Sequence, residues 1–463
     1  MSPAFPRMML VRQKFPASAP VDIRDTLAKE FALVKGRIKQ GAHIAVAVGS
    51  RGISNLQAII AGVLDQLKAA GAKPFIVPAM GSHGGATPEG QKELLAEYGI
   101  TEAALDVPIH AAMEARCLGT TEDGVEVFFS EEALKADGVV VVNRVKPHTD
   151  FLSDTLGSGL MKMLVVGLGK RVGAANYHVS SSRFGYEHVI RTSARITLGK
   201  APILFGVAIV ENQVHDTARL AVVLPDELEK RESELFMEAK GLMPRLPFDD
   251  IDLLIVDRLG KNISGSGMDP NIIGRSLHGY SALLGPPGVR PSPGAETFDT
   301  SMAAVMSGRV RSSDVSAPED GRTPLQESRG PSIRRIVVRD LTAESHGNAT
   351  GVGLADFTTT RLVRQMDGRV TYLNSLTALS LQSAKIPIHF ETDREVVAAA
   401  LQSLAMRDVM EAKVVRIQDT LSLERVAVSE SYADSMRQRS DLESMNEPVA
   451  MQFDAGGSLL PLR

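Results

Sequence analysis

Three loops in the N-terminal half of the chain carry charged or titratable side chains directly after a predicted strand. Arg51 lies in GSRGIS, His83 in MGSHGGATPEG and His148 in NRVKPHTD. In an open α/β sheet the loops that follow the strands gather at one edge, and ligands bind there. Three separate loops with such groups favour one functional site, although a solvated loop histidine is the alternative for the Gly-flanked His83.

Two further candidates, Lys162 and His178, lie in the segment TLGSGLMKMLVVGLGKRVGAANYHV. Leucine, methionine and valine surround Lys162, and an ammonium group is costly to desolvate in such surroundings. Lys162 is either a lysine that reaches solvent from a helix edge or a nucleophile that bonds covalently to a carbonyl or thiocarbonyl group. His178 suits either a core position or a metal site that uses a neutral imidazole.

The elements that must position these residues follow the alternating pattern of a βα-repeating domain. Short apolar runs predict buried strands, and apolar residues at helical spacing predict helices between them. The strands are expected at 43–49, 73–79, 138–145 and 203–210, and the helices at 55–72 and 88–99. Each of the three loops above follows one of these strands.

The stretch GLMPRLPFDD interrupts this pattern with two prolines and two acidic residues, so we expect a domain boundary there. Beyond it, the pattern predicts strands at 250–258, 333–340 and 413–418, helical segments at 354–383 and 393–404, and exposed turn-rich loops at 285–293 and 307–332.

We therefore expect an α/β fold of two domains, each with a mostly parallel sheet flanked by helices. The N-terminal domain would span 1–245 and the C-terminal domain 250–430, with the active site in the cleft between them. Residues 431–463 are expected to form a loosely ordered tail.

Composition narrows the class of function. The chain has 463 residues and a net charge of −4, and its basic residues are scattered, which disfavours nucleic acid and anionic membrane as partners. No apolar run is long enough for a membrane span and the N-terminus lacks a secretion signal, so we expect a cytoplasmic protein. Cys117 is the only cysteine, so a bound metal would need histidine or carboxylate ligands.

Five features of the N-terminal half together resemble the lactate racemase family. They are the arginine-bearing first loop, the Gly-x-His second loop, Pro147-His148, Ser158-Gly159-x-x-Lys162 and His178. Its members are 2-hydroxyacid racemases and epimerases that depend on a nickel-pincer nucleotide. The blocks DRLGKNISGSGMDPNIIGR and GNATGVGLADFTT in the second half also resemble family segments.

For the cofactor, the resemblance implies that Lys162 is joined through a thioamide to the pyridinium ring of the nickel-pincer nucleotide. His178 would complete the coordination of the nickel, a metal that accepts imidazole in a square-planar set. Cofactor-synthesis enzymes would supply this group.

For the substrate, the resemblance implies a small 2-hydroxyacid that is racemised by reversible hydride transfer. His83 and His148 would be the pair of acid/base residues. Arg51 would hold the substrate carboxylate through its planar guanidinium, and Lys261 in the second domain would close over the substrate.

Three departures from the family pattern put the identity of the substrate in question. Val48 stands where the best-known members have an aspartate, three residues before Arg51, and Leu160 replaces the second glycine of Ser-Gly-Gly-x-Lys. The interval between His148 and Lys162 is also a few residues longer. Lactate itself is therefore not implied as the substrate.

Two other functions are consistent with the same sequence. Glycines 167, 169 and 173 fit GxGxxxG, a weak relative of the dinucleotide fingerprint, which would suit a nicotinamide-dependent 2-hydroxyacid dehydrogenase. A non-catalytic hydroxyacid-binding protein of the same fold is the other alternative, although it would have no need of both histidines and the lysine.

Overall fold

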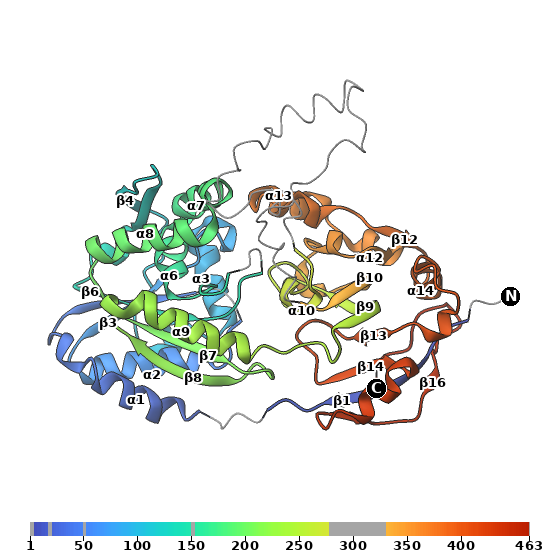
Figure 1. The fold of residues 1–463 in the computed structure, drawn as a ribbon. Helices are drawn as coiled ribbons and strands as arrows, with labels where there is room; N and C mark the ends of the chain where they lie inside the picture. The colour runs from blue at the N-terminus through green and yellow to red at the C-terminus, as the bar shows by residue number, and fades with distance from the viewer. Residues whose placement is uncertain (1–3, 17–20, 50–51, 150–152, 277–329, 463) are drawn as a thin grey trace, which may run out of the picture. The chain divides into compact units, whose positions relative to one another are not determined.

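The computed structural model describes residues 4–16, 21–49, 52–149, 153–276 and 330–462 (Figure 1). Arg51, the predicted loop at 285–293 and most of the predicted loop at 307–332 lie outside the described residues. The predicted α/β class is confirmed, because two sheets with parallel strands are each flanked by helices.

The first sheet has five strands in the order β3-β2-β6-β7-β8. Its members are β2 His43–Val48, β3 Lys73–Pro78, β6 Gly138–Arg144, β7 Ile203–Glu211 and β8 Thr217–Val223. The first four strands of this order are parallel, and β8 is antiparallel to β7. The four strands predicted from apolar runs are thus confirmed.

Side chains that alternate along these strands build a separate core on each face of the sheet. Ile44 and Val46 pack with residues of the helices α1 and α2, whereas Ala45 and Ala47 pack with residues of α6 to α9. Burial on both faces explains why these strands are nearly continuous apolar runs.

The helices of this half include the two predicted ones, which correspond to α2 and α3. They are α1 Ile23–Ala32, α2 Leu56–Ala69, α3 Pro88–Glu97, α4 Glu102–Leu105, α5 Glu131–Leu134, α6 Leu160–Lys162, α7 Lys170–Phe184, α8 Tyr186–Lys200 and α9 Leu228–Gly241. A small antiparallel pair, β4 Ala115–Thr120 with β5 Glu126–Ser130, stands apart from the large sheets.

The second sheet follows the order β12-β11-β10-β9-β13-β14-β1-β15, and β16 also pairs with β1. Its strands are β1 Arg7–Gln13, β9 Asp250–Leu259, β10 Ser332–Leu341, β11 Phe357–Thr359, β12 Ile388–Phe390, β13 Val414–Ile417, β14 Arg425–Ser429, β15 Leu442–Ser444 and β16 Val449–Ala450. From β12 to β13 the neighbours are parallel, and the remaining pairs are antiparallel. The helices of this half are α10 Pro270–Ile273, α12 Thr360–Gln365, α13 Gly368–Thr377, α14 Asp393–Gln402 and α15 Ala433–Arg437.

The second sheet includes two segments that the sequence pattern assigns to other parts of the protein. Strand β1, expected in the N-terminal domain, pairs with β14 so that Val11 lies opposite Val426. Strands β15 and β16, within the expected tail, pair with β1. Such pairing links residues that are distant in sequence, so a local pattern does not reveal it. The division between 245 and 250 stays a prediction.

The order of the first sheet creates a topological switch point. The chain runs from β2 to β3 on one side and later returns to β6 on the other side of β2. The loops after β2 and β6 therefore leave the sheet in opposite directions, and ligand sites of α/β sheets form at such points.

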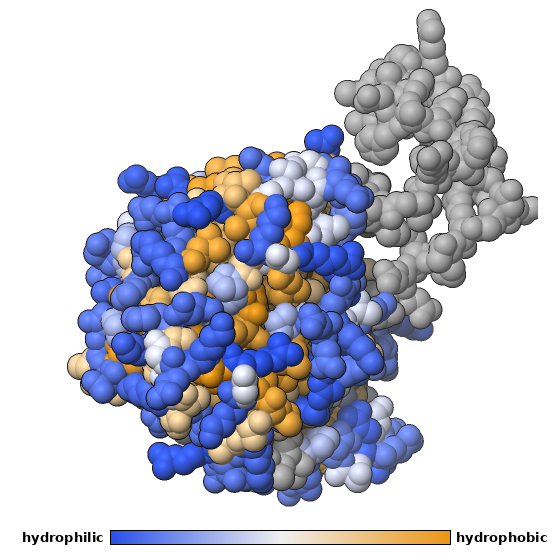
Figure 2. Space-filling model, turned by 90° about the vertical axis from the view of Figure 1, so that its left-hand side faces the viewer, coloured by the Kyte–Doolittle hydropathy of each residue, from blue (hydrophilic) through white to orange (hydrophobic). Residues whose placement is uncertain are grey.

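Hydrophobic and hydrophilic residues are mixed on the surface of the half that contains the five-stranded sheet. Figure 2 shows hydrophobic residues in irregular strips between hydrophilic ones on this face, which is usual for folded proteins. No helix in the described part of the chain is long and apolar enough to cross a membrane.

A buried ion pair anchors the last described residues to the second sheet. Arg339 of β10 donates through Nε to Asp393 Oδ2 at 2.9 Å, and the amide of Leu459 donates to the same oxygen at 2.9 Å. Arg339 is 8% exposed and Asp393 is 0% exposed, so the pair is shielded from water.

We expect Asp393→Ala to lower the free energy of unfolding by about 3 kcal/mol, because it leaves a buried guanidinium short of one partner. Asp434→Ala is the control, since it removes only an exposed pair with Arg437 and should cost about 1 kcal/mol or less. Urea denaturation followed by circular dichroism measures both values. Equal losses in the two variants would contradict an anchoring role for Asp393.

Candidate functional site

The carboxyl ends of β3, β2 and β6 lie side by side, because these strands are parallel neighbours. The loops that begin there carry Arg51, His83 and His148, so the expected convergence of the three loops holds at their starting points. His83 and His148 are half-buried. Arg51 itself lies outside the described residues.

The loop after β6 closes on itself at a narrow neck. Lys146 and Ser158 form an antiparallel bridge, with N···O distances of 2.9 and 2.8 Å in the two directions. Gly157 is required at this neck, because a Cβ there would lie 2.2 Å from the carbonyl oxygen of Lys146. The neck brings the Pro147-His148 end of the loop next to the segment that leads to Lys162.

Lys162 and His148 are in direct contact. The Nζ of Lys162 forms a hydrogen bond with Nε2 of His148, and both side chains are half-buried. Two residues that are 14 positions apart in the chain thus share one site.

A pair of buried tyrosines connects His148 to His178. The ring of His148 lies 5.2 Å from that of Tyr186, Tyr186 lies 5.6 Å from Tyr177, and Tyr177 lies 5.2 Å from His178. The hydroxyl of Tyr186 also donates to the carbonyl of Gly157 at 3.0 Å. Sequence reasoning missed both tyrosines, because an aromatic residue in an amphipathic helix looks like ordinary core.

The backbone between Lys162 and His178 departs from a regular α-helix. The short helix α6 ends at Lys162, the residues Met163–Gly167 form a π-helical turn, and α7 then carries His178. Such π turns within helices recur at functional sites. The turn also sets the position of Lys162 relative to His178.

The loop that carries His83 packs on this π turn. The amide of Gly81 donates to the carbonyl of Gly167 at 3.1 Å. A Cβ on Gly167 would lie 2.6 Å from the carbonyl oxygen of Ala79, so a larger residue would push the two segments apart. His83 therefore belongs to the same region as Lys162.

The glycines at 167, 169 and 173 do not form a dinucleotide-binding turn. That motif needs a strand followed by a glycine-rich turn and a helix, whereas Gly167 ends the π turn and Gly173 lies inside α7. A Cβ on Gly169 would meet the carbonyl oxygen of Val165 at 2.2 Å, which explains this glycine by close packing.

Lys261 lies in the loop after β9, and its side chain bonds within that loop. Its Nζ donates to the carbonyl of Gly265 at 2.6 Å, and its amide donates to Ser345 Oγ at 2.9 Å. The same loop leads to Asn271, whose Nδ2 donates to the carbonyl of His148 at 3.0 Å. The Lys261 loop is thus linked to the His148 loop through Asn271.

The described residues contain no group of three or more histidine, cysteine, aspartate or glutamate side chains that could hold a metal ion. His178 could provide one imidazole to a metal. The remaining donors would have to come from a bound group rather than from this part of the protein.

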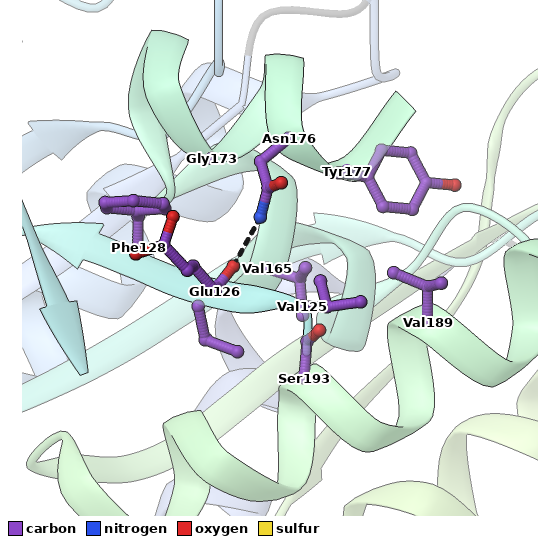
Figure 3. Close-up of a pocket in the computed structure, with 10 residues that line it drawn as sticks. Val125, Glu126, Phe128, Val165, Gly173, Asn176, Tyr177, Val189 and Ser193 are labelled. Atoms are coloured by element: carbon purple, nitrogen blue, oxygen red, sulfur yellow. Dashed lines mark hydrogen bonds between the residues drawn. The ribbon is translucent and has the colours of Figure 1, made fainter. Parts of the chain in front are cut away.

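A small cavity lies between α7, α8 and β5, and Tyr177 is among the residues that line it (Figure 3). Its lining comes from β5 and the residue before it, the π turn, α7 and α8, and the side-chain amide of Asn176 donates to the carbonyl of Glu126 at 2.6 Å. Neither Lys162 nor any of the candidate histidines lines this cavity, so we do not assign it to the site.

Comparison with protein families gives one match over this region. Residues 31–183 match the family described as the lactate racemase N-terminal domain. The matched segment contains His83, His148, Lys162 and His178. This part of the chain is thus similar to a lactate racemase N-terminal domain.

Among solved structures, the chain is similar to the lactate racemase apoprotein from Thermoanaerobacterium thermosaccharolyticum, with 14% sequence identity and a TM-score of 0.48. The match covers 90% of this chain and 99% of the other. A comparison with curated proteins found no match.

Within the matched segment, another lysine is buried where sequence reasoning expects none. Lys170 begins α7 and is 0% exposed. Its Nζ donates to the carbonyl of Pro78 at 2.7 Å, which ties the end of β3 to the helix that carries His178. Burial lowers the pKa of Lys170 to about 8. Its neighbours Gly169 and Arg171 give no local signal of this burial.

The lowered pKa of Lys170 predicts a pH dependence of stability. Between pH 8 and 10.5 the unfolded chain binds more protons at this residue than the folded chain, so stability rises with pH across this window. From pH 7 to pH 10, wild type should gain about 2–3 kcal/mol relative to Lys170→Met, which lacks the titrating group.

Urea unfolding of both proteins at each pH measures this difference. Lys39→Met, at an exposed position, is the control and should follow wild type throughout. A constant difference between wild type and Lys170→Met would show that the ammonium group is not desolvated in the folded state.

Proposed function

We propose that this protein is a racemase or epimerase of a small 2-hydroxyacid. The observation that carries the proposal is the contact between Lys162 and His148 inside a lactate racemase N-terminal domain. A lysine that can hold a cofactor and a histidine that can move a proton are the two kinds of residue that this reaction needs side by side.

We further propose a nickel-pincer nucleotide as the cofactor, tethered to Lys162 and coordinated through His178. The residues present fit such a group. His178 offers one imidazole without a surrounding set of protein ligands, which suits a metal whose other donors belong to the cofactor. Glycines 81 and 167 let the loop of His83 approach closely the π turn that follows Lys162. When bound, the group would accept the C2 hydrogen of the substrate as hydride and return it.

The residues of the chain would then bind the substrate and move its hydroxyl proton. Direct removal of the C2 proton from a hydroxycarboxylate would build up a dianion, and oxidation at C2 to a transient 2-keto acid avoids this. The hydroxyl of each enantiomer points to a different side, so His83 and His148, from separate loops, would each serve one of them. Every inversion would then use one histidine as the base for the substrate hydroxyl and the other as the acid that returns a proton to the product hydroxyl. Arg51 would hold the carboxylate, and Lys261 would approach it from the second half of the chain.

The first test concerns attachment and metal. When the protein is produced together with cofactor-synthesis enzymes, intact-mass measurement should find a covalent nucleotide on wild type and none on Lys162→Ala. His178→Ala should keep the organic adduct but hold less nickel, because it removes a metal ligand and not the tether. An adduct that persists on Lys162→Ala would rule out Lys162 as the attachment residue.

The second test concerns the hydrogen at C2. A substrate deuterated at C2 should be racemised with most of its label retained, and His83→Ala or His148→Ala should slow both directions by about 10²–10⁴-fold. Mass spectrometry of the product measures the label, and polarimetry or chiral chromatography measures the rates. Wash-out of the label into water in the first turnover would point to proton abstraction from C2 instead.

A nicotinamide-dependent dehydrogenase would behave differently in the same experiment. It would reduce free nicotinamide cofactor in proportion to the substrate consumed, whereas the proposed racemase needs none. The glycines that suggested this alternative lie in helical backbone, so the racemase is the function that the site supports best.

A further inference from the structure

Glu232 is a buried carboxyl group on the core face of α9. The buried side chains of this helix are Leu228, Glu232, Leu235, Phe236 and Ala239, and their spacing is that of a single apolar stripe. Glu232 is 0% exposed within this stripe. Burial of a carboxyl group costs several kcal/mol unless it is well bonded, so the position needs an explanation other than packing.

The carboxyl group of Glu232 faces the turn that leads to Lys162. The amide of Met161 donates to its Oε2 at 2.8 Å. Burial raises the pKa of Glu232 to about 7, and the amides of Met161 and Leu160 oppose this shift. The first turn of α6 has no side-chain cap of its own, so this carboxyl from another helix receives a backbone donor that would otherwise lack an acceptor.

The same carboxyl group explains why residue 159 is glycine. The φ of Gly159 is −170°, an extended conformation that any residue can adopt, so backbone freedom is not the reason. A Cβ at this position would lie 2.1 Å from Oε1 of Glu232. A side chain at residue 159 would therefore displace the carboxyl group from its present position.

On its other side, the turn is held by β6. The Nδ2 of Asn143 donates to the carbonyl of Gly159 at 2.8 Å, and the amide of Met163 donates to the same carbonyl at 3.1 Å. Residues 159–161 are thus fixed between strand β6 and helix α9, and Lys162 is the next residue in the chain.

We propose that Glu232 is a positioning residue that holds the Gly159–Met161 turn so that Lys162 is presented to its cofactor beside His148. This inference rests on the proposed function in so far as Lys162 carries the cofactor. It assigns to Glu232 no contact with the substrate or with the reacting atoms.

The test compares Glu232→Leu with Glu232→Gln. Leucine fills the core position but accepts no hydrogen bond, whereas glutamine still accepts one from Met161 through its amide oxygen. With cofactor-synthesis enzymes present, Glu232→Leu should carry about 10- to 100-fold less covalent nucleotide than wild type, as expected for a misplaced reacting group, and Glu232→Gln should restore most of it. Glu234→Leu changes an exposed residue of the same helix and is the matched control.

A second readout needs no cofactor. In unloaded protein, the rate at which an acylating reagent modifies Lys162 can be followed by peptide mass spectrometry, together with the melting temperature of each variant. We expect this rate to change several-fold in Glu232→Leu and to stay near wild type in Glu232→Gln and Glu234→Leu, with all variants folded.

The outcomes separate the two proposals. Absence of an adduct on wild type would overturn the proposed function, while the labelling rate of Lys162 would still decide the role of Glu232. Wild-type adduct and wild-type labelling in folded Glu232→Leu would overturn the positioning role. If Glu232→Leu unfolds, Glu232→Met takes its place, because this flexible apolar side chain also lacks the oxygen that accepts from Met161. Reduced adduct and altered labelling in folded Glu232→Met support the role, and wild-type values for both overturn it.

Discussion

The parallel pairing of β2 with β6 is the constraint on which the candidate site depends. These two strands are neighbours although the chain builds β3 between them in sequence, so the loops after them begin at one switch point. Asn143, near the end of β6, bonds to the carbonyl of Gly159 at 2.8 Å. The sheet thereby fixes the beginning of the His148 loop and the turn before Lys162 at the same time, and a shift of β6 would move both residues of the Lys162–His148 contact.

Two buried ionisable groups complete this framework from the helical side. Lys170 links the end of β3 to α7, and Glu232 links α9 to the turn before Lys162. A hydrogen bond stabilises the folded state by about 0.5–1.5 kcal/mol, or somewhat more when one partner is charged. This gain is smaller than the free-energy cost of burying an ionisable group. Stability alone therefore does not account for these residues. Each contact holds a segment that leads to or carries a candidate site residue, which is what a site built on rigid elements requires.

The local sequence pattern was sufficient to predict the strands whose side chains are buried on both faces of a sheet. The apolar runs at β2, β3, β6, β7 and β9 leave few alternatives to a parallel sheet. The same reasoning placed His83 and His148 at one edge, because the direction of parallel strands fixes where their loops lie. It was insufficient for β1, β15 and β16, since antiparallel pairing between the two ends of a chain depends on tertiary contacts.

The sequence also did not reveal which polar residues are buried against partners elsewhere in the fold. Glu232 lies in LEKRESELFMEAKG, where charged residues are so frequent that one buried glutamate cannot be told from its exposed neighbours. The tyrosines between His148 and His178 were missed because their role depends on ring contacts between α7, α8 and a distant loop. In each case the decisive partner lies far away in sequence, and the residue type alone gives no sign of it.

Leu160 and Val48, the two residues that depart from the family pattern, are both accommodated by their immediate surroundings. Leu160, in place of a glycine, is 0% exposed, and the space it fills exists because residue 206 of β7 is glycine, where a Cβ would lie 2.5 Å from Leu160 Cδ1. Val48 is also 0% exposed at the end of β2, so a carboxylate there would be buried in the core. Glu211 instead bonds to the loop after β2, where the amide of Ser54 donates to its Oε1 at 2.7 Å. Because Glu211 ends β7, the segment that follows β2 is tied at Ser54 to a different strand from β2, on which Val48 lies.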